Sequence, residues 1–226
     1  MLFSHQTSSK MIYNLSDQQS LVTQWISEIR DVEMQGDRLR FRRNMERLGE
    51  VAAYEISKQL PYVEKKIITP LGESVMQVIE QHPVIATILR AGVPMHNGLL
   101  HYFDKADSAF IAAYRKHHRD GSFEIEQNYI TCPNLEGRSL IVADPMLATG
   151  ASLLLALEAL LNYGVPSQIH IVSAIACVEG IENVQRKFPD VAIWAGAIDE
   201  ELTAKGYIVP GLGDAGDLSF GSKEQF

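Results

Sequence analysis

Short and almost continuously apolar runs recur along the chain after Pro83, separated by segments with a helical pattern. Five of these runs predict strands: Val84 to Leu89, Ser108 to Tyr114, Ser139 to Ala143, Gln168 to Cys177, and Val191 to Ile198. Strands that are apolar at nearly every position are covered on both faces, as in parallel sheets crossed by helices. The chain is therefore predicted to adopt an α/β fold with an open, mainly parallel five-stranded sheet flanked by helices.

The helices between the strands are predicted over Val93 to Phe103, Ala151 to Tyr163, and Ile181 to Phe188. A different pattern covers Lys116 to Glu136, which is long and polar and has Asp120-Gly121 as a turn centre. Connections of this length are usually lids or insertions, and apolar residues at alternate positions permit a two-stranded flap here. We expect this flap to close over a bound substrate.

Two amphipathic helices are predicted ahead of the sheet. The first starts near Ser16 and has an apolar face made of Leu21, Val22, Trp25, Ile26 and Ile29. The second runs from about Asp37 to Gln59, with the apolar stripe Phe41, Met45, Leu48, Val51, Ala52 and Ile56. It is also basic, through Arg38, Arg40, Arg42, Arg43 and Arg47. We interpret these arginines as a solvated face paired with neighbouring acids rather than as an effector site.

A chain of 226 residues can bury one substantial core, so we expect a single domain. Within it, we expect residues 1–60 to form an N-terminal helical extension, 84–199 the α/β core, and 200–226 a C-terminal hood. No stretch is long and apolar enough to span a bilayer, and residues 1–10 lack the apolar centre of a signal peptide. These features predict a cytoplasmic protein.

The net charge of −8 disfavours broad electrostatic attachment to nucleic acid or to an anionic membrane. An anionic small ligand would then need local positive charge, for which Arg90 and Arg115 are two of the candidates. The two cysteines, Cys132 and Cys177, have neither a neighbouring cysteine nor metal-ligand spacing, so both are predicted to be free thiols.

The segment from Asp144 to Ser152 joins a predicted strand to a helix through a small, hydroxyl-rich turn. Unpaired N–H groups at the helix N-terminus, and the hydroxyls of Thr149 and Ser152, can bind a phosphate that Gly150 lets approach the main chain. Asp144 is placed to accept hydrogen bonds from sugar hydroxyls. The segment therefore predicts a ribose phosphate ligand, with an ordinary strand-turn-helix as the alternative. The spacings of a Walker loop and of a dinucleotide-binding glycine motif are absent.

This segment resembles the phosphoribosyl diphosphate motif of the type I phosphoribosyltransferases, in the Asp-Pro-Met-Leu-Ala-Thr-Gly form of the uracil phosphoribosyltransferases. Gly206 to Asp217 resembles that family's uracil-binding stretch, and the similarity extends to Ile88–Gly92 and Ala113–Arg115. The resemblance covers most of the chain from about Phe41 onward. It implies the type I phosphoribosyltransferase fold and transfer of a phosphoribosyl group from 5-phospho-α-D-ribose 1-diphosphate to uracil, giving UMP and diphosphate.

The resemblance also assigns roles to residues. It implies that Asp144, Arg90 and Arg115 are catalytic. It implies that phosphoribosyl diphosphate is bound by Arg90, Ala91, Gly92, Arg115, Asp144, Pro145, Met146, Leu147, Ala148, Thr149, Gly150, Ala151, Ser152 and Asp214. Uracil is expected to contact Ile208, Gly213, Asp214 and Ala215. The family usually has a second glycine where this chain has Ala151, so the alanine is strained if that position needs a positive φ and harmless if it is helical.

Magnesium is expected as a cofactor, because the departing diphosphate is highly charged and hard cations prefer its oxygens. Most metal ligands would come from substrate and water, so no protein residue is assigned as a direct ligand. His117 and His118 on the flap are interpreted as solvated rather than as acid-base groups. A homo-oligomer (dimer or tetramer) and a GTP effector are implied by the resemblance alone.

Two other functions fit the same pattern. A regulator could keep the fold and the nucleotide pocket but sense UMP and bind RNA, although the acidic balance counts against RNA binding. A purine phosphoribosyltransferase is the other alternative. The loop from Gly206 to Asp217 argues against it, since a purine site would need different base edges to be read and more room.

Overall fold

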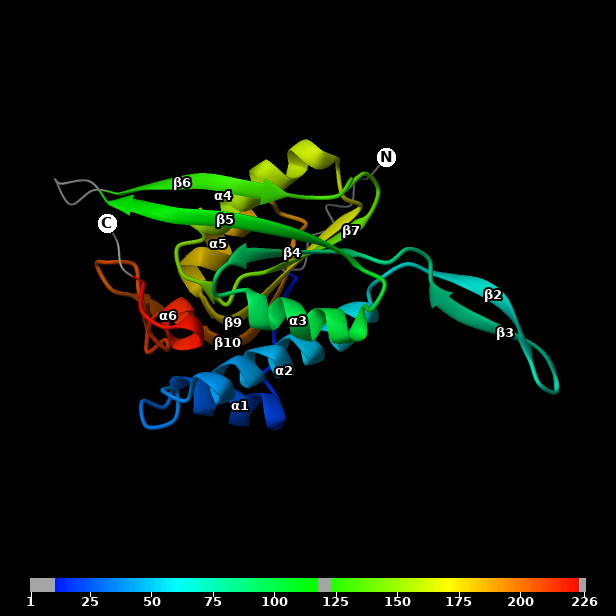
Figure 1. Cartoon of the computed structure of the whole chain (residues 1–226), viewed down its shortest axis with the longest axis horizontal. Helices are drawn as coiled ribbons and strands as arrows, with labels where there is room; N and C mark the ends of the chain where they lie inside the picture. Colours follow the sequence, from blue (N-terminus) through cyan, green and yellow to red (C-terminus); the bar gives the residue numbers. More distant parts are fainter. Residues whose placement is uncertain (1–10, 118–122, 224–226) are drawn as a thin grey trace, which may run out of the picture.

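The computed structural model describes residues 11–117 and 123–223, and at residues 113–117 and 123–128 it describes the backbone alone. A mainly parallel sheet lies at its centre (Figure 1). The parallel core of the sheet has the strand order β10-β9-β7-β4-β5. These strands are β4 (Val84–Leu89), β5 (Asp107–His117), β7 (Ser139–Ala143), β9 (Gln168–Cys177) and β10 (Ala192–Asp199). The α/β fold and all five predicted strands are thus confirmed.

The described sheet has eight strands rather than the five predicted. At one edge, β1 (Ile12–Asn14) pairs in parallel with β10, and β8 (Met146–Leu147) pairs with β9 inside the sheet. Both strands are too short, at three and two residues, to leave a periodic pattern in the sequence. At the other edge, β6 (Phe123–Thr131) pairs antiparallel with β5, which forms the two-stranded hairpin predicted for the flap.

Helices cover both faces of the sheet, which explains why its strands are so continuously apolar. On one face, α1 (Leu21–Arg30), α2 (Arg38–Ser57) and α3 (Val93–Tyr102) enclose a core that includes Ile85 of β4. On the other face, α4 (Ala151–Leu160) and α5 (Val178–Lys187) enclose a second core with Val84 and Ala86. The single turn Leu161–Tyr163 extends α4. Among the described residues, none of the helices has both the length and the hydropathy of a membrane span.

The first helix begins at Leu21 rather than near Ser16. Ser20 is its N-cap, because the Ser20 hydroxyl accepts a hydrogen bond from the Val22 N–H and the Thr23 hydroxyl accepts one from the Ser20 N–H. The Ser16 hydroxyl instead donates to the Gly196 carbonyl and ties the preceding loop to the sheet. The predicted start of the helix is therefore wrong by about one turn, while α2 begins as predicted, after its N-cap Asp37.

Two antiparallel strands, β2 (Tyr62–Thr69) and β3 (Gly72–Ile79), extend away from the rest of the protein as an arm (Figure 1). The hydrophobic pattern does not predict this arm, because Tyr62–Thr69 mixes apolar and charged residues without a regular alternation. Several apolar side chains project from it into solvent: Ile68, Leu71 and Val75 are 86%, 99% and 62% exposed. The arm is the largest feature of the described fold that sequence reasoning missed.

The C-terminal segment folds back over the ends of the sheet strands. It contains β11 (Glu201–Leu202), β12 (Ile208–Val209) and α6 (Ala215–Phe220). The first two pair with each other, and α6 lies beside α2 (Figure 1), where Arg42 donates to the Ser219 carbonyl at 2.7 Å. Ile208 and Ala215 belong to the same core as α1, α2 and α3. This packing fixes the segment as a hood over the ends of the strands.

Candidate functional site

The carboxyl ends of the inner strands β4 and β7 lie side by side and bring two predicted site residues to the same end of the sheet. Thr87 of β4 pairs with Ala143 of β7, so Arg90 and Asp144 follow at neighbouring strand ends. Ligands of open α/β sheets bind beyond the carboxyl ends of the strands. The fold thus places Arg90 and Asp144 where a ligand is expected.

The phosphate loop, residues 144–152, surrounds a cavity of about 130 Å³. Asp144, Met146 and residues 148–153 line the cavity together with Ile88 of β4. Gly150 is the N-cap of α4 with a φ of 81°, and its position supplies no side-chain cap for the helix. Uncapped amides at a helix N-terminus attract anions. The loop therefore combines a cavity of suitable size with a group of donors at its wall.

Ala151 is the first residue of α4, and among the described residues only glycines have a positive φ. The backbone at this position is thus one that alanine adopts without strain. The Thr149 hydroxyl accepts a hydrogen bond from the Ala151 N–H at 3.4 Å. The departure from the family's second glycine is therefore harmless to the backbone of the loop.

Asp144 lines the cavity and is held firmly through its backbone. Its N–H donates to the Val172 carbonyl at 3.0 Å, and its carbonyl accepts from the Ser173 hydroxyl at 2.6 Å. Burial raises the pKa of the Asp144 carboxyl to about 7, although a hydrogen bond from the Met146 backbone acts in the opposite direction. Strongly raised pKa values in a cavity are typical of functional carboxyls.

The turn Arg90-Ala91-Gly92 packs directly against the end of β7. A Cβ on Gly92 would lie 2.1 Å from the Thr87 Oγ1 and 2.8 Å from the Ala143 carbonyl oxygen, so only glycine fits there. The Arg90 side chain, 43% exposed, donates to Asp217 at 3.1 Å and to the Gly221 carbonyl at 3.2 Å. Arg90 thus links the turn after β4 to the C-terminal helix α6.

The base loop, residues 206–217, approaches both of the other loops. A Cβ on Gly206 would lie 3.8 Å from the Thr149 Cγ2, and one on Gly216 would lie 3.8 Å from the Arg90 guanidinium. Asp214 caps α6 by accepting hydrogen bonds from the Gly216 and Asp217 N–H groups at 2.8 and 3.0 Å. Burial raises the pKa of Asp214, but these bonds and the charge of Lys223 outweigh it, so the net shift is downward. An ionised carboxylate therefore lies close to the Arg90 turn.

The four residues predicted to contact a base differ in what they expose. Ile208 and Ala215 are packed into the core, at 6% and 3% exposed, so their side chains offer a ligand almost no surface. Gly213 has a φ of 93°, and a Cβ there would meet nothing within 4 Å. The base loop thus presents backbone groups beside open space, as a rigid loop that reads a flat ring requires.

Arg115 lies within a strand rather than just past the end of one. Because β5 continues to His117 through its pairing with β6, Arg115 is opposite Ile125 in the hairpin, beyond the last pair of β5 with β4 at Ala112. The side chains of Arg115 and His117, and all of His118, lie outside the described residues. The roles given to these side chains and the closure of the flap stay predictions.

Two residues of α5 support the phosphate loop without having been predicted. The Asn183 side chain donates to the Thr149 carbonyl at 3.1 Å, across 34 positions of sequence. A Cβ on Gly180 would lie 2.2 Å from the Ala148 carbonyl oxygen and 3.0 Å from that of Leu147. Because both contacts join separate segments of the chain, no local sequence pattern signals them. They make α5 the support behind the loop.

The similarity to known proteins extends over the phosphate loop, the Arg90 turn and the base loop. A family model described as uracil phosphoribosyltransferase matches residues 16–222. The chain is 48% identical to the uracil phosphoribosyltransferase of Porphyromonas gingivalis, over 94% of this chain and 99% of that protein. It is 39% identical to the uracil phosphoribosyltransferase of Pyrococcus furiosus, over 93% and 90% of the two chains. Among solved structures it is similar to the AQ2163 protein from Aquifex aeolicus, with a TM-score of 0.83 and 32% identity over 93% and 98% of the two chains.

Proposed function

The chain belongs to the uracil phosphoribosyltransferase family, and we propose that it transfers the phosphoribosyl group of 5-phospho-α-D-ribose 1-diphosphate to uracil, giving UMP and diphosphate. The site is assigned on one observation: three loops meet at the carboxyl ends of the sheet strands. The phosphate loop, the Arg90 turn and the base loop each have the chemistry of one part of the substrates. A ribose phosphate, a diphosphate and a flat base can then be bound together.

The reaction needs positioning and charge stabilisation rather than a protein nucleophile, because the ribose becomes cationic as the diphosphate leaves. We assign the 5′-phosphate to the amides and hydroxyls of the phosphate loop around Thr149 and Ser152. We assign the ribose hydroxyls to the carboxylate of Asp144, a residue that lines the same cavity. An ionised Asp144 accepts hydrogen bonds from the sugar and also stabilises the positive charge that develops on it.

The departing diphosphate is assigned to Arg90, to the backbone of Ala91 and Gly92, and to Arg115 of the flap. Magnesium supplies additional positive charge to this leaving group when it is bound. The ion would be held mainly by the oxygens of the diphosphate and by water; among the described residues, no cluster of three or more His, Cys, Asp or Glu side chains could bind a metal. Hard cations that bind mainly through phosphate oxygens and water need no such cluster. We therefore assign no direct protein ligand.

The base is assigned to the backbone groups near Gly213 and Asp214. Uracil has a fixed pattern of carbonyl acceptors and N–H donors, which a rigid loop can read without charged side chains. Cytosine presents an amino group where uracil has a carbonyl, which leaves a buried donor facing a donor. We therefore expect a strong preference for uracil over cytosine.

The assignment is tested by mixing the purified protein with labelled phosphoribosyl diphosphate, magnesium and one free base at a time. We expect UMP to form from uracil, with little product from cytosine, hypoxanthine or guanine. Turnover of a purine but not of uracil would identify a purine phosphoribosyltransferase. Tight UMP binding without turnover of any base would identify a UMP-sensing regulator.

Restoring the family's second glycine should change the activity little. We expect Ala151→Gly to leave kcat/KM for phosphoribosyl diphosphate within about threefold, because the position is already helical. The same change should destabilise the protein by about 0.5–1 kcal/mol, the usual effect of glycine in a helix. Steady-state kinetics and thermal unfolding measure the two effects. A tenfold gain in kcat/KM would contradict the expectation and indicate that the alanine methyl group obstructs the phosphate.

We further propose that the protein is a homo-oligomer in which the β2–β3 arm contacts a second copy. Isolated two-stranded hairpins are only marginally stable in water, and exposed apolar surface of this kind usually marks an interface. Ile68, Leu71 and Val75 on the arm are all highly exposed. A partner of the same sequence would cover them.

Charged residues on the arm should separate the copies. We expect the double change Ile68→Lys and Leu71→Lys to reduce the molecular mass in solution to that of one chain, measured by light scattering with size-exclusion chromatography. Leu39→Lys is the matched control, since Leu39 is 72% exposed but lies on α2. A monomeric wild-type protein, or a double variant of unchanged mass, would rule out the arm as the interface.

The GTP effector stays a prediction that comes from the family alone. On the basic face of α2, two of the five arginines form ion pairs within the chain: Arg40 with Glu28, and Arg43 with Glu46. Arg42 donates to a carbonyl of α6. These contacts support the interpretation of the arginines as a paired structural face.

A further inference from the structure

Arg30 and Asp199 form an ion pair that joins the end of α1 to the end of β10. Arg30 is the last residue of α1, and Asp199 is the last residue of β10. The two guanidinium N–H groups donate to the two carboxylate oxygens at 2.7 and 2.8 Å. The Asp199 side chain is 7% exposed and that of Arg30 is 21% exposed. A bidentate pair so shielded from water is a stronger constraint than the usual surface ion pair.

Both members of the pair also bond to Gly211 in the base loop. The Gly211 N–H donates to Asp199 Oδ2 at 2.9 Å, and its carbonyl accepts from Arg30 Nη1 at 3.0 Å. Gly211 has a φ of 57°, and a Cβ there would lie 2.2 Å from the Ile208 carbonyl oxygen. The pair thus satisfies both polar backbone groups of a residue that cannot carry a side chain, and it sets the direction in which the following peptides leave.

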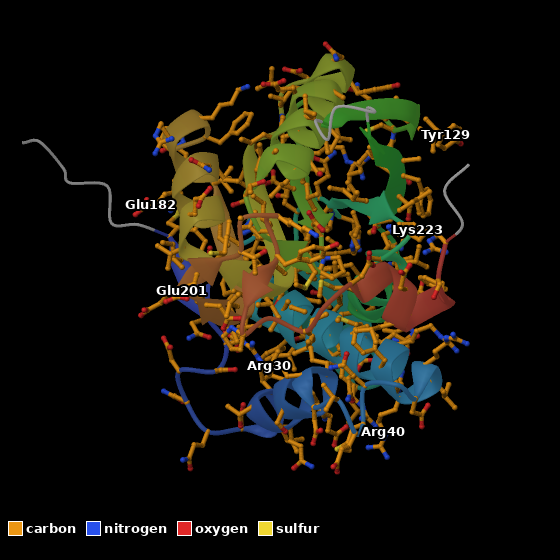
Figure 2. The ribbon with its side chains drawn as sticks, turned by 90° about the vertical axis from the view of Figure 1, so that its left-hand side faces the viewer. Arg30, Arg40, Tyr129, Glu182, Glu201 and Lys223 are labelled. Carbon is orange, nitrogen blue, oxygen red and sulfur yellow. The ribbon has the colours of Figure 1, made fainter. Side chains whose placement is uncertain are left out.

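Gly211 stands two positions before Gly213, where the loop opens to free space. Between them Leu212 is buried at 5% exposed, and after them Asp214 caps α6. Figure 2 shows Arg30 at the junction of the N-terminal helices with the C-terminal segment, whereas Arg40 lies farther along the helices. The ion pair is therefore the polar anchor on the N-terminal side of the base-reading peptides, as the α6 cap is on the other side.

We propose that Arg30 and Asp199 are positioning residues for base recognition, which hold Gly211 so that the backbone groups of Gly213 and Asp214 face the pyrimidine. The inference rests on the proposed function, because that function assigns the base to this loop. Neither side chain contacts the substrates. The proposal gives α1, at the start of the chain, a part in a site that is built from later segments.

The test compares Arg30→Met and Asp199→Asn with matched controls at the other ion pair of α1. Arg40→Met and Glu28→Gln weaken a pair whose acid is 8% exposed and which does not contact the base loop. The readouts are KM for uracil and for phosphoribosyl diphosphate measured separately, and the rate of conversion of cytosine. Amide hydrogen exchange of residues 206–217 is measured in the substrate-free proteins.

We expect both test variants to raise KM for uracil by about tenfold or more, since a hydrogen bond to a charged group contributes about that factor. KM for phosphoribosyl diphosphate should change by less than about threefold, because the phosphate loop does not contact the pair. Arg30→Lys, which keeps the charge and some of the donors, should recover part of the loss. In the substrate-free protein the Gly211 amide should exchange faster in Asp199→Asn than in Glu28→Gln.

Equal increases in both KM values, or effects no larger than those of the control variants, would overturn the proposal. So would an unchanged exchange rate at Gly211 in Asp199→Asn. If Arg30→Met does not fold, Arg30→Lys and Asp199→Asn provide the same comparison. A wild-type protein that does not convert uracil would reject the proposed function instead, and the exchange measurement, which needs no substrate, distinguishes that failure from a failure of the positioning role.

Discussion

Asp144→Asn is expected to lower kcat/KM for phosphoribosyl diphosphate by about 100-fold while leaving the protein folded. In the proposed assignment the ionised carboxylate accepts charge-assisted hydrogen bonds from the ribose hydroxyls, each contributing about 1.5–3 kcal/mol, and the amide lacks the charge that would stabilise the sugar cation. The asparagine side chain has nearly the same volume as the aspartate that it replaces. The contacts of residue 144 with Val172 and Ser173 involve only its backbone, so they are kept. Steady-state kinetics and circular dichroism measure the two outcomes.

The same carboxyl predicts how activity and stability vary with pH. Burial raises its pKa to about 7 from the ordinary value of 3.8, so the carboxyl becomes ionised as the pH rises through about 7. We expect kcat/KM to rise with pH through about 7 and then to level off. Between about pH 4 and 7 the native state holds a proton that the unfolded chain has released, so this group makes the free energy of unfolding fall as pH rises. Asp144→Asn should remove both effects.

Asp104→Asn is a suitable control, because it changes an exposed acid on the loop after α3 and should alter neither profile. Wild-type kcat/KM in the Asp144→Asn variant would show that the sugar is bound elsewhere. A rise of activity through neutral pH that persists in the variant would assign the titration to another group.

The second large effect is expected at Gly180, although this residue contacts no substrate. A Cβ there would lie 2.2 Å from the Ala148 carbonyl oxygen and would force the phosphate loop and α5 apart. Displacing a binding group by about 1 Å can reduce the rate by about 100-fold, and overpacking usually destabilises a protein by about 1–3 kcal/mol. We therefore expect Gly180→Ala to lower kcat/KM for phosphoribosyl diphosphate by about 100-fold with a modest loss of stability.

Gly36→Ala is the matched control, since a Cβ at Gly36, in the turn between α1 and α2, meets nothing within 4 Å. Calorimetric titration with UMP separates binding from turnover. If Gly180→Ala binds UMP as tightly as the wild-type protein does, the phosphate loop is not held in place by α5, and the support assigned to that helix is wrong.

The fold and the phosphate loop could be predicted from sequence because their signals are contiguous. The strand Ser139–Ala143 is buried at every position, so burial on both faces leaves an unbroken apolar run. Asp144, Gly150 and the hydroxyls around it follow within a few residues, which places a carboxylate and a helix N-terminus together without knowledge of the tertiary structure. The base loop is predicted only through the similarity to a known family.

What escaped prediction depends on contacts between distant segments. Arg30 and Asp199 are 169 positions apart, and nothing near either residue indicates that they meet at Gly211. The start of α1 is a similar case. Ser16 and Ser20 both suit an N-cap, but the Ser16 hydroxyl donates to the Gly196 carbonyl of β10 while Ser20 caps the helix. Tertiary context overrides local preference at such positions.

The contact of Arg90 with Asp217 has a consequence for catalytic turnover. If Arg90 binds the diphosphate as we propose, the incoming anion exchanges with the Asp217 carboxylate that the guanidinium contacts. The affinity gained is only the difference between the two ion pairs. Once the bond to the sugar has broken, Asp217 competes for the same guanidinium and favours release of the product diphosphate. In this assignment, Asp217 is an internal competitor for the leaving group.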